Sequence, residues 1–454
     1  MTTVDKRVFA PKTTEKLHSF TRFAIGGRAG NGVLVSHDCV HCDCTDGTLR
    51  SGIGLRDYAL FEGGIFVQGN MPEADEFFAY ADGGTERKLG FISTGGTPYY
   101  YDDNEGRWVQ EESYYTQTKA LTAMDKTGAY HTLYIGGSGV FRQTQTGRSF
   151  CGFEYALPVA CAFMGRVFFA LDERTLVYSE AYEPYEFTES LHGGGKIVLS
   201  GENGKIVAMI PFEGEVYLFF ERGISVLTAG GSPREFAVRK MEYHGSKIFA
   251  RSVTACGNKI FFLTEDGFFT VGKSGLAMTG ENLELAHRQP TRVRGKATFN
   301  GKYICSFSAD DGKNYTVVID GEKGTGYDTF TVEGLSEYLT STLCVSNFSV
   351  REFCEKGELP TVEAKRKFTF SNAFGSGVKT LKRLSFTGKG KMTLAVSNGR
   401  KSKLFSLDLS SGKTSARIGL RGRVFTVSLV LERDTEVESA TALTEVLQGV
   451  NYDD

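Results

Sequence analysis

Between about residues 158 and 320 the sequence states one short pattern four times. Each copy places a glycine between two runs of apolar and aromatic residues, and these glycines are Gly165, Gly214, Gly257 and Gly301. The intervals between them are 49, 43 and 44 residues. A period in the forties, built from short aromatic and β-branched strands with glycine turns, is typical of β-propeller blades. The repeat therefore predicts an all-β chain that contains a propeller.

Within one copy, Ile260–Leu263 is expected to be a buried strand and Phe268–Val271 the strand that returns from a tight turn. Further blade-like hairpins are expected at 59–67, Lys88–Tyr101 and Tyr130–Phe141, and they account for two less regular blades. With the four aligned copies this makes about six blades. The periodicity is lost after Phe330, so six and seven blades both stay open.

A different pattern begins near residue 363, where apolar residues alternate strictly with basic or hydroxyl residues. Such alternation is typical of strands with one wet face. It occurs in the segments Lys367–Phe370, Thr380–Phe386, Met392–Val396, Lys403–Leu409 and Arg423–Leu431. The predicted organisation is an irregular N-terminal segment over 1–55 that partly closes the propeller, a propeller over 56–362, and a small C-terminal β-sandwich with an acidic tail over 363–454.

Charge divides the chain in the same way. The whole chain carries −2, yet Glu363 to Phe425 holds fifteen Lys and Arg against two acidic residues, which is +13 and leaves −15 elsewhere. The simplest interpretation is a solvated sheet face. The alternative is an electrostatic contact with DNA or with the acidic part of a neighbouring subunit.

Composition agrees with an all-β chain, because 55 Gly and 35 Phe stand beside only 9 Pro and one Trp. Glycine supplies the positive φ angles of tight hairpin turns. No run approaches the roughly 18 apolar residues of a membrane span, and the N-terminus lacks the apolar stretch of a secretory signal. We expect a soluble protein made in a cytosol, with its nine cysteines reduced.

The densest group of metal-ligand residue types is His37, Cys39, His41, Cys42 and Cys44. Thiolate and imidazole are the ligands that zinc prefers, so this segment could bind a metal. Neighbouring residues of one extended stretch cannot all face one ion, however, and the chain has no second C-x-x-C pair. A packed hairpin with free thiols is the favoured hypothesis.

Other motifs do not add up to an active site. Ser308–Tyr315 is similar to the Asp-box of sialidase-type propellers, but Asn314 and Tyr315 stand where that box has Thr and Trp. The favoured interpretation is an Asp-Gly hairpin turn. No H-E-x-x-H, G-x-S-x-G or dinucleotide fingerprint occurs. We assign no catalytic, cofactor-binding or metal-binding residue, and we expect the chain not to be an enzyme.

The strand patterns do resemble one family. Gly165–Ala170 followed by Val177–Glu180 and Pro184–Phe187 is similar to a pattern in propeller proteins of tailed-bacteriophage tails, of the nozzle or tail-tubular type. Similar patterns continue in Ile206–Phe236 and Arg251–Phe268, and Ala416–Leu429 resembles the end of such tail proteins. The resemblance covers about residues 160 to 430 and does not extend to the first 55.

The resemblance implies a non-catalytic virion protein, assembled in the host cytoplasm, whose copies form a ring around the channel through which DNA leaves. Its implied partners are copies of itself and other tail or adaptor proteins, with contact to DNA through the basic 363–425 segment. The alternative function is a propeller that binds glycans or hydrolyses them in a sialidase-like way. A cytosolic scaffold propeller is a third hypothesis.

Overall fold

The computed structural model describes residues 13–26, 30–59, 71, 73–111, 118–190, 193–243, 245–283, 288–346, 349–361, 364–371 and 373–447. The chain forms two compact units. Unit 1 comprises 1–54, 326–329 and 355–454, and unit 2 comprises 55–325 and 330–354. The helices of the described residues are the short 3-10 helices η1 (Pro233–Glu235), η2 (Ala250–Ser252) and η3 (Glu281–Leu283). None of these helices has the length and hydropathy needed to cross a bilayer.

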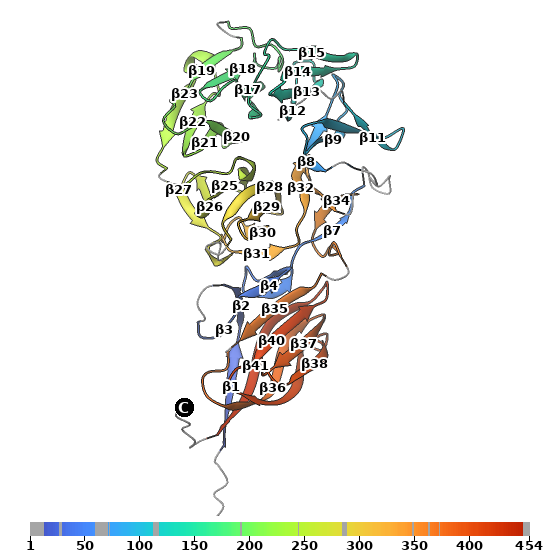
Figure 1. Ribbon diagram of the computed structural model, residues 1–454, viewed down its shortest axis with the longest axis vertical. Coiled ribbons are helices and arrows are strands. Elements are labelled where there is room, and N and C mark those ends of the chain that lie inside the picture. The colour runs from blue at the N-terminus through green and yellow to red at the C-terminus, as the bar shows by residue number, and fades with distance from the viewer. Residues whose placement is uncertain are drawn as a thin grey trace, which may run out of the picture. The chain divides into compact units, whose positions relative to one another are not determined.

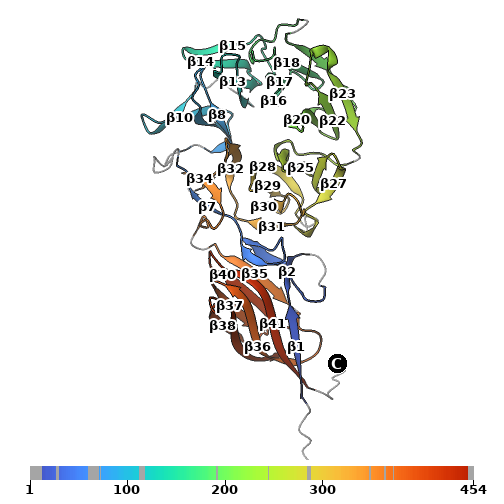
Figure 2. The same cartoon turned by 180° about the vertical axis from the view of Figure 1, so that it is seen from behind.

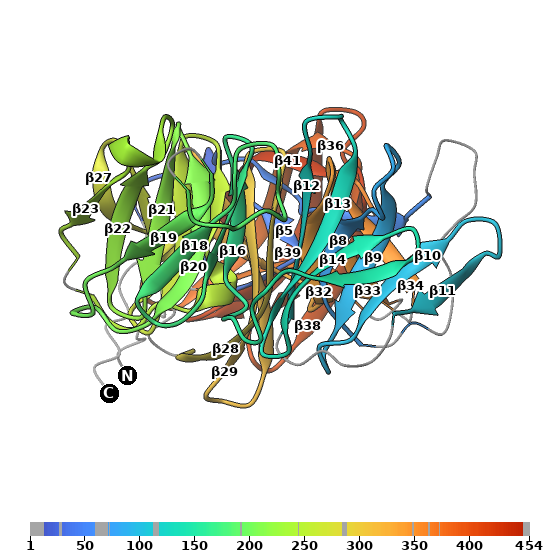
Figure 3. The ribbon, with the colours of Figure 1, turned by 90° about the horizontal axis from the view of Figure 1, so that it is seen from above.

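Unit 2 is a β-propeller with seven blades among its described residues (Figures 1 and 2). Six are four-stranded antiparallel sheets, and blade 6 contributes three strands to this unit. From the innermost strand outward, blade 1 is β8 (Ala74–Tyr80), β9 (Lys88–Ser93), β10 (Pro98–Asp102) and β11 (Arg107–Gln110), blade 2 is β12 (Thr118–Met124), β13 (Tyr130–Gly136), β14 (Gly139–Thr144) and β15 (Gly147–Phe150), and blade 3 is β16 (Ala160–Phe163), β17 (Arg166–Ala170), β18 (Thr175–Tyr178) and β19 (Gly195–Val198). Blade 4 is β20 (Ile206–Phe212), β21 (Glu215–Phe220), β22 (Gly223–Thr228) and β23 (Ala237–Met241), and blade 5 is β24 (Thr254–Cys256), β25 (Lys259–Thr264), β26 (Gly267–Gly272) and β27 (Gly275–Thr279). Blade 6 is β28 (Pro290–Phe299), β29 (Lys302–Ala309) and β30 (Asn314–Asp320), and blade 7 is β32 (Glu333–Tyr338), β33 (Ser341–Ser346), β34 (Ser349–Cys354) and β7 (Gly54–Asp57). Figure 3 shows the outward order β20 to β23 from another side.

The glycines of the sequence repeat are the turns between the first two strands of four blades. Gly165 joins β16 to β17 with φ 71°, and the residue before it, Met164, has φ 48°. Glu213–Gly214 and Asn300–Gly301 repeat this pair of positive φ angles. Two consecutive positive φ angles define the two-residue turn that matches the twist of a β-hairpin, and glycine adopts them without strain. The spacing of the glycines is thus the spacing of the blades.

The second strand of each blade is buried on both faces, because it lies between the two neighbouring blades. Every residue of β17 is buried, including Phe168 and Phe169. Aromatic rings of successive blades touch: Phe219 meets Phe262 edge-on with ring centroids 5.3 Å apart. A strand covered on both faces has continuous apolar sequence instead of alternation, which explains the Phe-rich runs of the repeat.

The ring is closed in two ways. Each innermost strand contacts the innermost strand of the next blade, and β32 of the last blade contacts β8 of the first. The last blade also takes its outermost strand, β7, from near the N-terminus. Ion pairs fasten β7 to β34, with Arg351 Nη1 2.9 Å from Asp57 Oδ1 and Arg56 Nη2 2.7 Å from Glu352 Oε2.

Unit 1 is a β-sandwich. One sheet has the order β39 (Lys413–Gly422), β36 (Lys379–Lys389), β41 (Glu436–Leu447), β6 (Leu49–Ser51), β5 (Cys42–Asp43), and β1 (Thr13–Phe20) also pairs with β41. Within this unit the other sheet has the order β31 (Gly326–Thr329), β4 (Asp38–Val40), β35 (Arg366–Ser371), β40 (Thr426–Leu431), β37 (Lys391–Ser397), β38 (Ser402–Asp408). A parallel pair, β2 (Arg22–Ile25) and β3 (Val33–Ser36), accompanies them. Phe368, Phe386, Leu394 and Leu429 are fully buried in the shared core.

The all-β propeller and the C-terminal sandwich agree with the sequence-based prediction. The blade count, which the sequence left open between six and seven, is seven in the described residues, because β32 to β34 form a blade with β7. One detail is corrected. The first 55 residues are not an irregular segment. Their strands β1 to β6 belong to the sandwich unit, and only β7 joins the propeller. The hairpin expected at 59–67 lies almost wholly outside the described residues.

If β7 is needed to close the ring, truncating its buried Leu55 should destabilise unit 2 as a whole. Leu55→Ala is expected to lower the free energy of unfolding by about 2–5 kcal/mol, the usual cost of truncating a buried leucine. Trp108, the single tryptophan, lies in unit 2, so its fluorescence during denaturant unfolding reports on the propeller.

The matched control is Leu276→Ala, because Leu276 lies on β27, also an outermost strand, and is 37% exposed. The control should cost less than about 1 kcal/mol. Equal effects of the two substitutions would mean that β7 is no more than an ordinary edge strand.

Candidate functional site

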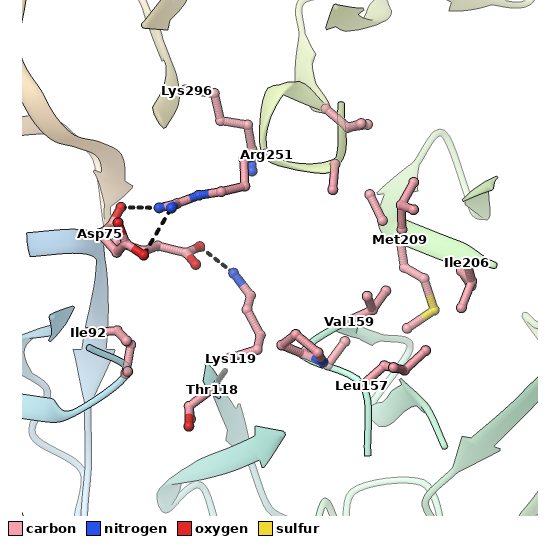
Figure 4. A pocket seen from close by; sticks show the side chains of 18 of the residues that line it. Asp75, Ile92, Thr118, Lys119, Leu157, Val159, Ile206, Met209, Arg251 and Lys296 are labelled. Carbon is pink, nitrogen blue, oxygen red and sulfur yellow. Dashed lines mark hydrogen bonds and ion pairs between the residues drawn. The ribbon is translucent and has the colours of Figure 1, made fainter. Parts of the chain in front are cut away.

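The innermost strands of unit 2 surround a cavity of about 610 Å³. Its lining comes from β8, β12, the segment before β16, β20, η2 and β28, so five of the seven blades and a helix contribute to it. We call it the axial cavity. Figure 4 shows two different sides: charged side chains from β8, β12, η2 and β28 on one, and aliphatic side chains from β20 and the segment before β16 on the other.

Irregular pairing at the start of β8 explains how two neighbouring acidic residues come to line the cavity. The register of β8 against β9 shifts between Ala74 and Glu76, so that Asp75 is the extra residue of a bulge. Side chains alternate between the two faces in a regular strand, whereas a bulge re-aims them locally. Asp75 and Glu76 therefore both border the cavity.

Both carboxylates are held by cations from other blades. Arg251 Nη1 lies 2.9 Å from Asp75 Oδ2, and its Nη2 donates a hydrogen bond of 2.6 Å to the backbone oxygen of Asp75. Lys119 on β12 forms an ion pair with Glu76. These pairs appear as dashed lines in Figure 4. They join blades that are distant in sequence, and they leave neither carboxylate free to act as a general base.

The charges of this cluster shift one another's titration. Burial alone would raise the pKa of Glu76, but the positive charges of Lys119 and Lys296 outweigh it and lower the pKa to about 2. Burial lowers the pKa of Lys296, and the charge of Lys119 lowers it further, while Glu76 acts in the opposite direction. The neighbouring cations Lys119, Lys296 and Arg251 therefore keep the Glu76 carboxyl group ionised.

The cysteine and histidine segment lies in unit 1, and its thiols are buried in the sandwich core. Cys39, Cys42 and Cys44 are at most 7% exposed. Cys39 Sγ donates a hydrogen bond of 3.9 Å to the backbone oxygen of Cys42. The neighbouring thiols of Cys42 and Cys44 lower the pKa of Cys39, whereas burial raises the pKa of Cys42 and Cys44. None of the nine cysteines forms a disulfide in the structure. Among the residues with described placement, no group of three or more His, Cys, Asp or Glu could hold a metal ion.

The two histidines of this segment take separate roles. His41 has a positive φ of 56°, and its backbone N–H donates to the oxygen of Asp328 at 2.9 Å. His37 lies instead at a second cavity of unit 1, together with His18 and Phe370. The expected packed hairpin is therefore wrong: β4 pairs with β35 and β5 pairs with β6, so the turn at His41 joins two different sheets of the sandwich.

The Asp-box-like segment is the turn between β29 and β30. Asp311 Oδ1 accepts a hydrogen bond of 3.0 Å from the backbone of Lys313, and its Oδ2 accepts one of 2.7 Å from the Tyr315 hydroxyl. These contacts fix a hairpin turn, as the favoured interpretation expected.

A second charged feature lies on the open face of the β36–β39 sheet in unit 1. The register places Arg383 directly opposite Arg417, and Arg421 and Lys413 follow on the same exposed side of β39. None of these four forms an ion pair with another residue in the part of the chain that the structure describes. We call them the basic face. Like charges directly opposite each other in a sheet destabilise it, so this arrangement favours an anionic partner.

Comparisons with known proteins yield only the fold. No protein-family model matches the chain, and no curated protein matches it. Among solved structures it is similar to virginiamycin B lyase from Staphylococcus aureus, with 8% identity over 66% of this chain and 99% of that chain and a TM-score of 0.44. It is also similar to the Swd1 propeller domain from Myceliophteria thermophila, with 10% identity over 66% and 99% of the two chains and a TM-score of 0.42. The extracellular domain of BT4673 from B. thetaiotaomicron matches with 10% identity over 90% of this chain and 62% of that chain, with a TM-score of 0.44. Likenesses this distant say nothing of activity.

The sequence interpretation assigned no site residue, and the axial cluster had no local signal that could reveal it. Asp75, Lys119, Arg251 and Lys296 are separated by 44, 132 and 45 residues. Only the closed ring brings them together. The exposed basic residues of β36 and β39, in contrast, could be recognised in the sequence because they alternate with apolar residues.

Replacing Glu76 should test the cross-blade pair. Glu76→Gln is expected to destabilise unit 2 at neutral pH, because Lys119 and Lys296 lose their anionic neighbour. Since folding lowers the Glu76 pKa from its usual 4.5 to about 2, its contribution is complete above about pH 5 and is lost as the pH falls through about 2. Denaturant midpoints from Trp108 fluorescence should therefore differ most at pH 7 and converge towards pH 3.

Glu173→Gln, at an exposed position of the same unit, is the control and should match the wild type at both pH values. A Glu76→Gln midpoint equal to the wild type at pH 7 would contradict the role given to this pair.

Proposed function

We propose that this chain is a non-catalytic structural protein of the tail of a bacteriophage or prophage, and that its copies assemble through their oppositely charged units. In this proposal the ring of copies surrounds the DNA exit channel, and the chain is located in the virion after assembly in the host cytoplasm. The resemblance of its strand patterns to nozzle-type tail proteins supports the virion role. The observation that carries assembly is the basic face of unit 1.

The net charges of the two units support contacts between copies. Unit 1 contains 24 Lys and Arg against 17 Asp and Glu, a net charge of +7. Since the whole chain carries −2, the net charge of unit 2 is −9. Opposite charges steer association and fix which surfaces meet. On unit 1 the four cations of the basic face share one exposed sheet face, where Arg383 and Arg417 stand opposite each other. An acidic surface of a neighbouring propeller would relieve this repulsion.

The composition of the axial cavity supports the non-catalytic role. Its two carboxylates are ion-paired, and its described lining contains Arg251 as its single arginine and no aromatic ring. A sialidase-like clamp would need three arginines. Sugar-binding sites usually stack rings on aromatic side chains. The glycan-directed alternative therefore has less support than the structural role.

Charge reversal on the basic face tests the proposal. Purified wild-type chain should form oligomers in native mass spectrometry and negative-stain images at about 0.1 M salt, and these should dissociate near 1 M, where the Debye length falls from about 10 Å to about 3 Å. The double variant Arg417→Glu, Arg421→Glu should stay monomeric at both salt concentrations. Lys196→Glu, an exposed position on β19 of unit 2, is the control that should assemble normally.

A second arm distinguishes protein assembly from DNA binding by the same face. Retention of labelled duplex DNA by the wild type but not by the double variant, without any oligomer, would assign the basic face to DNA. Monomers at every concentration, without DNA retention and without association with virions, would contradict the proposal.

A further inference from the structure

The axial cavity contains a cation that the cross-blade pairs do not use. Lys296 on β28 borders the cavity and is half-buried. It forms no ion pair or hydrogen bond with any other described residue, and the carboxylates of Glu76 and Glu337 act on it only through longer-range electrostatics. A half-buried ammonium without a direct partner is costly, because burial removes water from its three donors. It therefore favours an anion in the cavity.

The charges around Lys296 leave room for that anion. Asp75 and Glu76 are the acidic lining residues, and Arg251 and Lys119 already pair with them. Lys205 is the remaining basic lining residue, and its Nζ lies 3.9 Å from Glu221 Oε1. After these pairs are formed, Lys296 is the cationic group left to meet a ligand. One negative charge would balance it.

The wall opposite the charges is aliphatic. Val159, Ile206 and Met209 face the cavity from that side in Figure 4, with Leu157 beside them. An apolar ligand body gains about 25 cal/mol for each Å² of apolar surface that it buries. The absence of aromatic rings from the described lining favours a flexible aliphatic body over a flat ring or a sugar.

We propose that the axial cavity binds a small aliphatic carboxylic acid, with its carboxylate on Lys296 and its hydrocarbon chain against Val159, Ile206 and Met209. The volume of about 610 Å³ lies within the range of small-molecule sites. The carboxylate accepts a charge-assisted hydrogen bond from the Lys296 ammonium, which is stronger than a neutral one. This role does not depend on assembly, because every lining residue belongs to unit 2 of one chain.

Octanoate is a suitable probe, with octan-1-ol and octyltrimethylammonium as neutral and cationic ligands of the same chain length. Isothermal titration of the full chain should show one saturable octanoate site, with octan-1-ol at least about tenfold weaker and the ammonium compound without binding. Equal affinity for octanoate and octan-1-ol would overturn the role of Lys296. Absence of saturable octanoate binding would overturn the proposal.

Two variants test the contacts of the ligand's carboxylate and of its hydrocarbon tail separately. Lys296→Met keeps the length and removes the charge, and it should weaken octanoate about tenfold, the effect of losing one charge-assisted hydrogen bond, while leaving octan-1-ol unchanged. Met209→Trp fills the aliphatic side and should abolish binding of both ligands. The control is Lys196→Met on the exposed face of β19, which should bind as the wild type does.

Unfolding followed by circular dichroism, which the added tryptophan of Met209→Trp does not confuse, will show whether each variant is folded before it is titrated. If a folded Lys296→Met variant binds octanoate as tightly as the wild type, the carboxylate is not held by Lys296 and the assignment is wrong.

Discussion

Closure of the ring is the constraint on which the rest of unit 2 depends. Each second strand, such as β17 or β25, is apolar on both faces, so a blade that lacked a neighbour would expose an aromatic surface. Only a complete circle provides two neighbours for every blade. The chain completes it by pairing β7 with β34 and by placing β32 against β8. Since a missing neighbour would expose both flanking blades, the seven blades should unfold together.

The same closure creates the axial cavity and determines what can occupy it. The innermost strands converge from different blades, and irregular register in β8, β20, β28 and β32 interrupts their regular alternation. Bulges concentrate where side chains have to be re-aimed. In β8 the bulge turns Asp75 and Glu76 towards cations of other blades, so ion pairs link the blades at the centre of the ring.

How much the sequence could predict follows from which contacts are local. The blades could be predicted from Gly165, Gly214 and Gly301, because a two-residue turn with positive φ angles favours glycine and so leaves a local signal in the sequence. The seventh blade stayed open because its first turn uses Leu339, at φ 52°, and its outer strand comes from the other end of the chain. Similarly, alternation identified the wet strands of the sandwich. The pairing of Arg383 with Arg417 required a register that shifts at Leu381, and no periodicity reveals such a shift.

The two cationic groups of the molecule differ in their exposure to solvent, and this difference separates their proposed roles. Arg417 and Arg421 point into water, where salt screens their charge within about 8 Å at physiological ionic strength. They suit a broad acidic surface that meets many charges at once. Lys296 lies in a cavity bordered by aliphatic side chains, where screening is weaker and geometry matters more. It suits one small anion whose hydrocarbon body can displace water, so the two groups can act in the same chain without competing for a ligand.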